Sequence, residues 1–292
     1  MLNHNDATAA LSLSALPSPL VTTPEARSWS DGLERACLAG IMTAKGTRLQ
    51  FAEMMTADCL AARDGTLAEP RIVVSSNGSV IARYHRDQAF RRLIDHADVV
   101  DADGMPMVNF TRLFWKKPFP ERVATTDFVH DACRMAAREG LRFYFLGGKP
   151  GVAARAADRL TGLYPGLQVV GTRHGYFAPE DEIDLCRQIV DSGADVLWVG
   201  LGSPRQEAFA FRQRSRLAGL GWIRTCGGLF DFCSGDARRA PQLLQNLGLE
   251  WLYRASLEPI RLGVRYISTN PSAMWHLITK SDESDCTPAE RP

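Results

Sequence analysis

Hydrophobic residues fall into short, nearly continuous runs that are separated by longer amphipathic stretches. The runs cover residues 71–76, 97–101, 141–147, 167–171, 195–201 and 222–226. Uninterrupted apolar runs of this length are typical of strands that are covered on both faces of a sheet. The stretches between them have helical spacing, and one is bounded by Pro150 and by Pro165-Gly166. Strands that alternate with helices predict an α/β fold with a doubly wound, mainly parallel, Rossmann-like sheet.

The pattern changes at both ends of the chain. Residues 1–28 are rich in Ala, Ser, Leu, Thr and Pro and lack a basic region before their apolar stretch, so we expect a disordered leader rather than a signal peptide. Residues 29–245 form the predicted α/β core. Residues 246–279 mix aromatic and arginine side chains and predict a helical appendage, and residues 280–292 predict a disordered tail. No window reaches the ~18 consecutive apolar residues that a membrane span requires.

Composition narrows the classes of function. A formal net charge of +1 over 292 residues does not favour nucleic-acid binding, which usually needs a clearly basic domain. The six histidines are scattered, and the seven cysteines form no CxxC pair. This pattern favours buried thiols in a reducing compartment over a zinc site or a disulfide framework. We therefore expect no metal and no cofactor.

Glycine-rich turns follow three of the predicted strands, and ligands of α/β sheets gather where strands end. In "GGKPG" (147–151) the backbone amides could cradle a phosphate, although the same letters suit a plain tight turn. "GLGSPRQE" (200–207) offers polar side chains to a base or a sugar, or is simply a helix start. "CGGLFDFCSGDARRAP" (226–241) carries aromatic residues that a solvated loop would not need. The candidate donor-binding residues in these turns are Gly147, Gly148, Gly200, Gly202, Gln206, Glu207, Gly227, Gly228, Asp231 and Arg239.

Another strand end carries two carboxylates, in "ADVVDADGMPMV" (97–108). Asp101 and Asp103 could together hold a divalent metal on a sugar diphosphate. Alternatively, one of them could accept a proton from an attacking hydroxyl group. The residues of this stretch leave both interpretations open.

Taken in order, eight blocks of this chain resemble those of the WecG/TagA/CpsF glycosyltransferases. They are "VVSSN", "ADVVDADGMPMV", "PERV", "FLGGKPGVAARAADRL", "YPGLQVVGTRHGYF", "ADVLWVGLGSPRQE", "GGLFDFCSGDARRAP" and "GLEWLYRASLEPIRL". The resemblance implies an inverting, metal-independent transferase. It would move a sugar from UDP to an undecaprenyl-diphosphate-linked acceptor during polysaccharide, common antigen or teichoic acid synthesis. The family aspartate falls on Asp103, and its Thr/Asn pair falls on Ser75 and Asn77. The chain departs from the family at Ser75, usually Thr, and at Thr125, usually Gly.

An inverting transfer needs a base for the acceptor and positive charge for the departing diphosphate. Arginine forks suit phosphate oxygens, and Arg239, Arg254, Arg261 and Arg265 are available. We therefore interpret Asp103 as the base and Asp101 as a strand-end residue. Gly104 would let the acceptor sugar approach closely.

The appendage fits the same function. An aromatic and basic helical segment suits the membrane interface, here the cytoplasmic face of the inner membrane, and the competing interpretation is a helix packed on the core. Two other functions stay open: a metal-dependent transferase that uses Asp101 and Asp103, and a UDP-sugar-binding regulator without catalysis. An NAD-dependent oxidoreductase is disfavoured because no strand-linked GxGxxG is present. The sugar, the acceptor and any homo-oligomer are not determined by the sequence.

Overall fold

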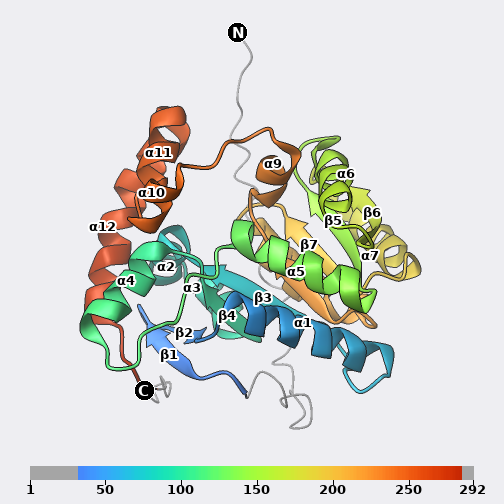
Figure 1. The fold of residues 1–292 in the computed structure, drawn as a ribbon, viewed down its shortest axis with the longest axis horizontal. Helices are drawn as coiled ribbons and strands as arrows, with labels where there is room; N and C mark the ends of the chain where they lie inside the picture. Colours follow the sequence, from blue (N-terminus) through green and yellow to red (C-terminus); the bar gives the residue numbers. More distant parts are fainter. Residues whose placement is uncertain (1–31, 285–292) are drawn as a thin grey trace.

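The centre of the molecule is a six-stranded, all-parallel sheet with the strand order β4-β3-β8-β7-β5-β6 (Figure 1). The computed structural model describes residues 32–284, so the predicted leader lies outside the described residues. The strands are β3 (Arg71–Ser76), β4 (Val99–Ala102), β5 (Arg142–Gly147), β6 (Gln168–Arg173), β7 (Val196–Gly200) and β8 (Trp222–Thr225). Each strand begins within two residues of the start of a predicted apolar run, so the prediction of a Rossmann-like α/β fold is confirmed.

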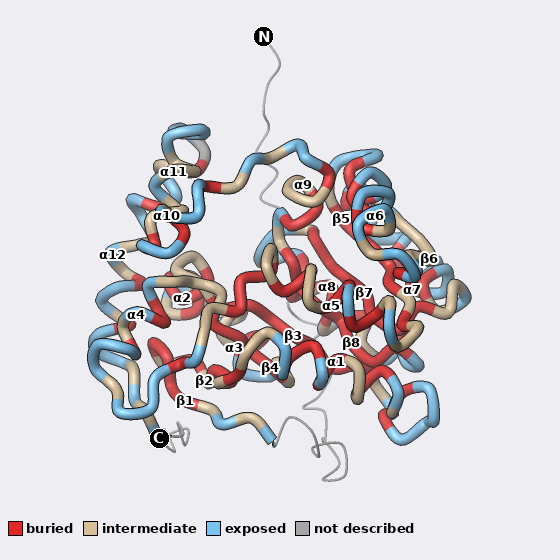
Figure 2. Tube along the Cα trace, in the orientation of Figure 1, coloured by how far each residue is buried: buried red, intermediate tan, exposed pale blue. Residues whose placement is uncertain are grey.

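Helices cover both faces of this sheet. One face carries α2 (Gly78–Arg86), α3 (Gln88–Asp95), α7 (Glu182–Asp191) and α8 (Arg205–Gln213). The other face carries α1 (Arg48–Arg63), α5 (Thr125–Glu139), α6 (Val152–Leu163) and α9 (Leu229–Ser234). Two hydrophobic cores result, and the buried strands between them are visible in Figure 2. The helix α4 (Met105–Phe114) follows β4 at one edge of the sheet.

Local signals explain several of the helix ends. Thr47 and Gln50 form a reciprocal capping box at the start of α1. The side chain of Asn77 accepts hydrogen bonds from two backbone amides of α2, and Asp87 does the same for α3. Gly140 ends α5 with φ of 66°, a left-handed conformation that costs glycine little.

A small hairpin precedes the sheet and is an element that we did not predict. It consists of β1 (Arg35–Leu38) and β2 (Ile41–Ala44), which pair in antiparallel register. Its outer strand also meets the end of the chain, because Cys37 and Asp282 exchange backbone hydrogen bonds of 3.0 and 2.9 Å. Residues 280–284, the first part of the predicted tail, therefore pack on β1, and residues 285–292 lie outside the described range.

The C-terminal helices are α10 (Gln242–Asn246), α11 (Glu250–Leu257) and α12 (Val264–Thr279), with a π-helical turn at Pro259–Gly263 between the last two. One face of α12 packs on α2, where Tyr266, Ala273 and Leu277 are buried. The opposite face is exposed and apolar: Val264, Ile267, Met274, Trp275 and Ile278. Within residues 32–284, no helix combines the length and the hydropathy needed to cross a bilayer.

Candidate active site

A cavity of about 590 Å³ opens at the carboxyl ends of β5, β7 and β8. The helix after β5, α6, and the helix after β7, α8, lie on opposite faces of the sheet. Such a divergence between neighbouring strands leaves a crevice at their carboxyl ends, where ligands of open α/β sheets bind. The cavity is lined by Gly148, Lys149, Val152, Gly175, Tyr176, Gly200, Leu201, Arg205, Gly228, Asp231, Phe232, Asp236, Ala237, Arg254 and Glu258.

Glycines allow the backbones of β5 and β7 to meet at the floor of this crevice. A side chain on Gly147 would place its Cβ 2.3 Å from the carbonyl oxygen of Gly200. A Cβ on Gly200 would in turn lie 2.9 Å from the carbonyl oxygen of Gly227. The predicted glycine turns are therefore brought together, with Gly148, Gly200 and Gly228 on the cavity wall. Gly202, by contrast, is exposed outside it.

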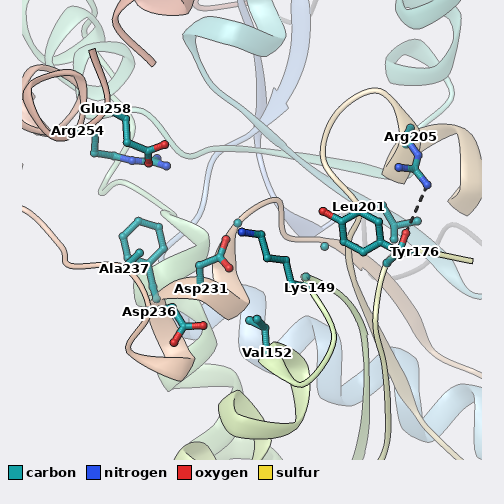
Figure 3. A pocket seen from close by; sticks show the side chains of 15 residues that line it. Lys149, Val152, Tyr176, Leu201, Arg205, Asp231, Asp236, Ala237, Arg254 and Glu258 are labelled. Atoms are coloured by element: carbon teal, nitrogen blue, oxygen red, sulfur yellow. Dashed lines mark hydrogen bonds between the residues drawn. The ribbon is translucent and has the colours of Figure 1, made fainter. Parts of the chain in front are cut away.

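Charged side chains enter the cavity from several elements (Figure 3). Lys149 and Asp231 point into it from the turn after β5 and from α9, while Arg254 and Glu258 face them from α11 and its end. The guanidinium of Arg254 lies 5.2 Å from the ring centre of Phe232. The wall of the cavity thus carries three cationic side chains, Lys149, Arg205 and Arg254, together with three carboxylates, Asp231, Asp236 and Glu258.

Asp103 follows β4 and is partly exposed. Its amide donates a 2.9 Å hydrogen bond to the carbonyl oxygen of Ser76, which continues the β3–β4 ladder past the end of the strand. Within residues 32–284, its carboxylate takes part in no hydrogen bond or ion pair. Burial, together with the charge of Asp101, raises the pKa of Asp103 to about 7. A carboxylate of this kind is suited to exchange a proton near neutral pH.

Asp101 has a different environment, because it is fully buried against an arginine. Nη1 of Arg224 in β8 lies 2.5 Å from Oδ2 of Asp101, and both side chains are at most 1% exposed. Burial raises the pKa of Asp101, while the charge of Arg224 opposes that effect. The Arg224 guanidinium also lies 5.3 Å from the ring centre of Phe128. The Asp101 carboxylate is therefore already paired with a buried guanidinium inside the protein.

Ser75 belongs to the same buried cluster. Arg224 Nη2 donates a 2.9 Å hydrogen bond to Ser75 Oγ and a 3.4 Å hydrogen bond to Thr125 Oγ1. The two hydroxyl oxygens are themselves 2.9 Å apart. Thr125, in the first turn of α5, is buried. The two positions at which the chain departs from the family pattern are thus in direct contact.

Three other predicted site residues are used inside the fold. Asn77 caps α2 through its side-chain oxygen. Gln206 accepts a 3.0 Å hydrogen bond from the amide of Gly227 and donates one of 2.9 Å to Glu207. Glu207 is fully buried, and burial raises its pKa. Gln206 therefore joins the turn after β7 to the turn after β8, below the cavity rather than in it.

Arg239 lies outside the cavity, in a charged cluster that joins the appendage to the core. Both Arg239 and Arg122 form ion pairs with Asp127 of α5 and with Glu250 of α11. Arg239 also donates a 2.7 Å hydrogen bond to the side chain of Gln245. This cluster fixes the start of α11 above α5.

The helix α11 carries both a charge that acts on Asp103 and a residue of the cavity wall. The charge of Glu250, in its first turn, acts on the pKa of Asp103, and Arg254, one turn later, lines the cavity. Four helical residues rise by about 6 Å. Arg265 lies outside the cavity, is exposed and donates a hydrogen bond to the Tyr266 hydroxyl. The side chain of Arg261 lies outside the described part of the structure.

Several charged residues of the site were not predicted from the sequence. Lys149 and Arg205 stand inside two of the quoted glycine-rich motifs, where we considered only the backbone amides and the neighbouring polar residues. Arg224 could have been noticed as a charged residue in the apolar run at 222–226. Within residues 32–284, no group of three or more His, Cys, Asp or Glu side chains is arranged to hold a metal ion.

The chain was compared with known protein families, and it matches a family of glycosyl transferases. The sequence model of the glycosyl transferase WecG/TagA/CpsF family matches residues 41–285. The matched range includes every strand of the parallel sheet, the cavity, Asp103 and the appendage helices.

Proposed function

The chain belongs to the WecG/TagA/CpsF family of glycosyl transferases, and on this basis we propose that it transfers a sugar from UDP to a lipid-linked acceptor with inversion at the anomeric carbon. The acceptor would be an undecaprenyl-diphosphate-linked saccharide, and the product a precursor of a cell-surface polysaccharide. The observation that carries this proposal is Asp103: a carboxylate at the end of β4 with no partner among the described residues, a pKa of about 7, and a pKa that responds to the charge of Glu250, one turn before the cavity residue Arg254.

The cavity suits the donor. A UDP-sugar carries a diphosphate, and Lys149, Arg205 and Arg254 supply positive charge for its oxygens. The ring of Tyr176 and the ring of Phe232 also line the cavity and offer flat surfaces to a base. When the bond to the sugar breaks, negative charge grows on the departing UDP, and these cations would stabilise it.

Asp103 would act on the opposite side of the sugar. In an inverting transfer, the acceptor hydroxyl attacks the anomeric carbon as the bond to UDP breaks, and its proton passes to a base. Asp103 would take that proton. With a pKa of about 7, it is substantially ionised at neutral pH and still basic enough to accept a proton.

The competing metal-dependent function would need Asp101 and Asp103 together. The contact between Asp101 and Arg224 supports the assignment of Asp103 as a base, because the guanidinium already balances the negative charge of the Asp101 carboxylate. A metal ion on Asp101 would have to displace this buried ion pair, which is costly. The appendage supports a membrane location, because α12 presents an exposed stripe of five apolar side chains.

One assay tests the proposed function. Purified protein is incubated with individual UDP-sugars and a short-chain diphospholipid-linked saccharide, with and without EDTA, and UDP release is measured. We expect acceptor-dependent release that survives EDTA and that is lost in D103N. UDP-sugar binding without release for every sugar would favour a regulator. Complete loss with EDTA, restored by Mn²⁺, would favour the metal-dependent enzyme.

A further inference from the structure

The end of α4 carries a compact apolar and basic surface that lies outside the appendage. Leu113 and Phe114 are 75% and 66% exposed at the last two positions of this helix. Arg112, Lys116 and Lys117 beside them are exposed as well. We call residues 112–117 the α4 tip. Two large apolar side chains surrounded by three cations are the pattern of a surface that inserts between anionic lipid headgroups.

The α4 tip is held rigidly, so its exposure is not that of a loose loop. The Phe114 ring packs at a tilt against Phe110, Phe110 contacts Trp115 edge to face, and Trp115 in turn contacts the buried Phe119. Arg112 donates a 3.0 Å hydrogen bond to the carbonyl oxygen of Pro120. The apolar side chains therefore stay exposed although an aromatic cluster lies directly beneath them.

The tip adjoins the segment that follows the end of the appendage. The amides of Lys116 and Lys117 donate hydrogen bonds to the carboxylate of Glu283, just beyond α12. At its other end, α4 lies against the connection between α10 and α11, because a Cβ on Gly248 would be 3.4 Å from Pro106. Figure 1 shows α4 and α12 on the same flank of the molecule. Nearby acidic groups are Glu283 and Glu34, the latter 3.8 Å from Lys117.

The other end of α4 begins at the candidate base. Asp103 and Gly104 directly precede Met105, the first residue of the helix. Ten helical residues span about 15 Å. A diphosphate with one or two sugars has a similar length, so an acceptor anchored in the bilayer at the tip could place its terminal hydroxyl near Asp103.

We propose that the α4 tip is a second bilayer contact, which docks on anionic lipid and sets the depth from which the lipid-linked acceptor reaches Asp103. This inference rests on the proposed function and adds a surface outside residues 246–279. The occupant is the lipid surface because cations flank the exposed apolar side chains on both sides, which suits headgroups and acyl chains together.

Vesicle flotation tests the tip directly. L113S/F114S should float at least about tenfold less than the unaltered protein with phosphatidylglycerol/phosphatidylethanolamine vesicles. K116E/K117E should lose binding to these vesicles but keep its weaker binding to pure phosphatidylcholine. The matched control is L163S, because Leu163 is 63% exposed at the end of α6 and outside this flank. Unchanged flotation of L113S/F114S would overturn the proposal, and so would a change in sedimentation alone, which would make the tip a contact between copies.

Activity separates this inference from the proposed function. L113S/F114S should lose turnover on a lipid-linked acceptor in vesicles and keep it on a water-soluble acceptor. A nitroxide on L113C should become shielded from an aqueous relaxation reagent when vesicles are added, whereas one on L163C should not. If the unaltered protein releases no UDP with the soluble acceptor, the proposed function fails whatever the vesicles show, whereas normal turnover by D103N would remove only the role of Asp103 as the base. If L113C stays accessible on bound vesicles, the docking surface fails alone.

Discussion

Arg224 in β8 and Asp101 in β4 form a buried ion pair across the intervening strand β3, with 2.5 Å between Nη1 and Oδ2. The guanidinium reaches the carboxylate past Ser75, whose hydroxyl it also binds. The charges of Asp101 and Arg224 both act on the pKa of Asp103, the candidate base.

Asp103 and Asp101 should respond differently to replacement by asparagine. D103N should keep UDP-sugar affinity and lose turnover by a factor on the order of 10² or more, because the proton acceptor is gone. D101N should instead lose about 3–5 kcal/mol of folding free energy, since it leaves Arg224 buried without a counter-charge. Urea unfolding and steady-state kinetics measure the two effects. Equal kinetic losses at both positions, rescued by Mn²⁺, would contradict this assignment.

Turnover should rise with pH through about 7, because the Asp103 carboxylate must be ionised to accept a proton. The same shift affects stability. Because the pKa of Asp103 is raised in the folded state, its protonated carboxyl group contributes stability to the fold. This stability is fully present below the unfolded pKa near 4 and is lost as the pH rises through about 7. D103N should therefore be more stable than the unaltered protein at pH 8, by about 4 kcal/mol, and closer to it at pH 4. Thermal melts at both pH values check this.

Removing Arg224 should move the acid limb of the pH profile downwards. Without its counter-charge the buried Asp101 carboxyl is held neutral, so Asp103 loses a negative neighbour that acts on its pKa more strongly than Arg224 does. The double variant R224M/D101N removes both charges outright, so its acid limb should match that of R224M, and its stability should exceed that of R224M. Carboxyl ¹³C shifts of Asp103, assigned by comparison with D103N, measure the titration without turnover. Identical titration in R224M and the unaltered protein would refute the effect.

Arg254 and Arg265 offer a matched pair in the appendage. R254A should weaken UDP-sugar binding by about tenfold or more, because it removes a cation from the cavity wall. R265A should change binding little, since Arg265 is exposed outside the cavity. Isothermal titration with UDP, which carries the same diphosphate, measures the affinity of each variant. Equal losses in the two variants would mean that the whole helical segment moves onto the ligand.

Ser75 and Thr125 should be energetically coupled. S75T adds a methyl group beside a buried Thr125 hydroxyl and should cost about 1–3 kcal/mol. In S75T/T125G the glycine makes room, so the double variant should lose less than the sum of the single changes. Calorimetric unfolding of the four proteins gives the coupling. Strict additivity would show that the two side chains are not energetically coupled.

The strands were predictable because each is a short apolar run, which reflects a sheet buried on both faces. The hairpin at residues 35–44 was missed although its sequence is apolar, because each strand has only four residues and the turn at Ala39-Gly40 divides a single apolar run between them. Asp103, Gly148 and Gly200 could be identified at strand ends from local sequence alone. The pairing of Arg224 with Asp101 could not, because the two residues are far apart along the chain and meet only through the strand order. Arg239 was assigned to the donor for its charge, yet its nearest charge is Asp127.

All strands of the sheet are parallel, so the chain enters every strand on the side of the sheet opposite the cavity. Ion pairs stabilise these amino-terminal strand ends: Asp195 pairs with Arg63 and Arg142, and Asp58 pairs with Arg71. The exposed turn at residues 64–66 lies there, between α1 and β3. A fluorophore or a solid support attached at this turn would leave the cavity and the α4 tip unobstructed, which makes it a suitable handle for immobilising the enzyme.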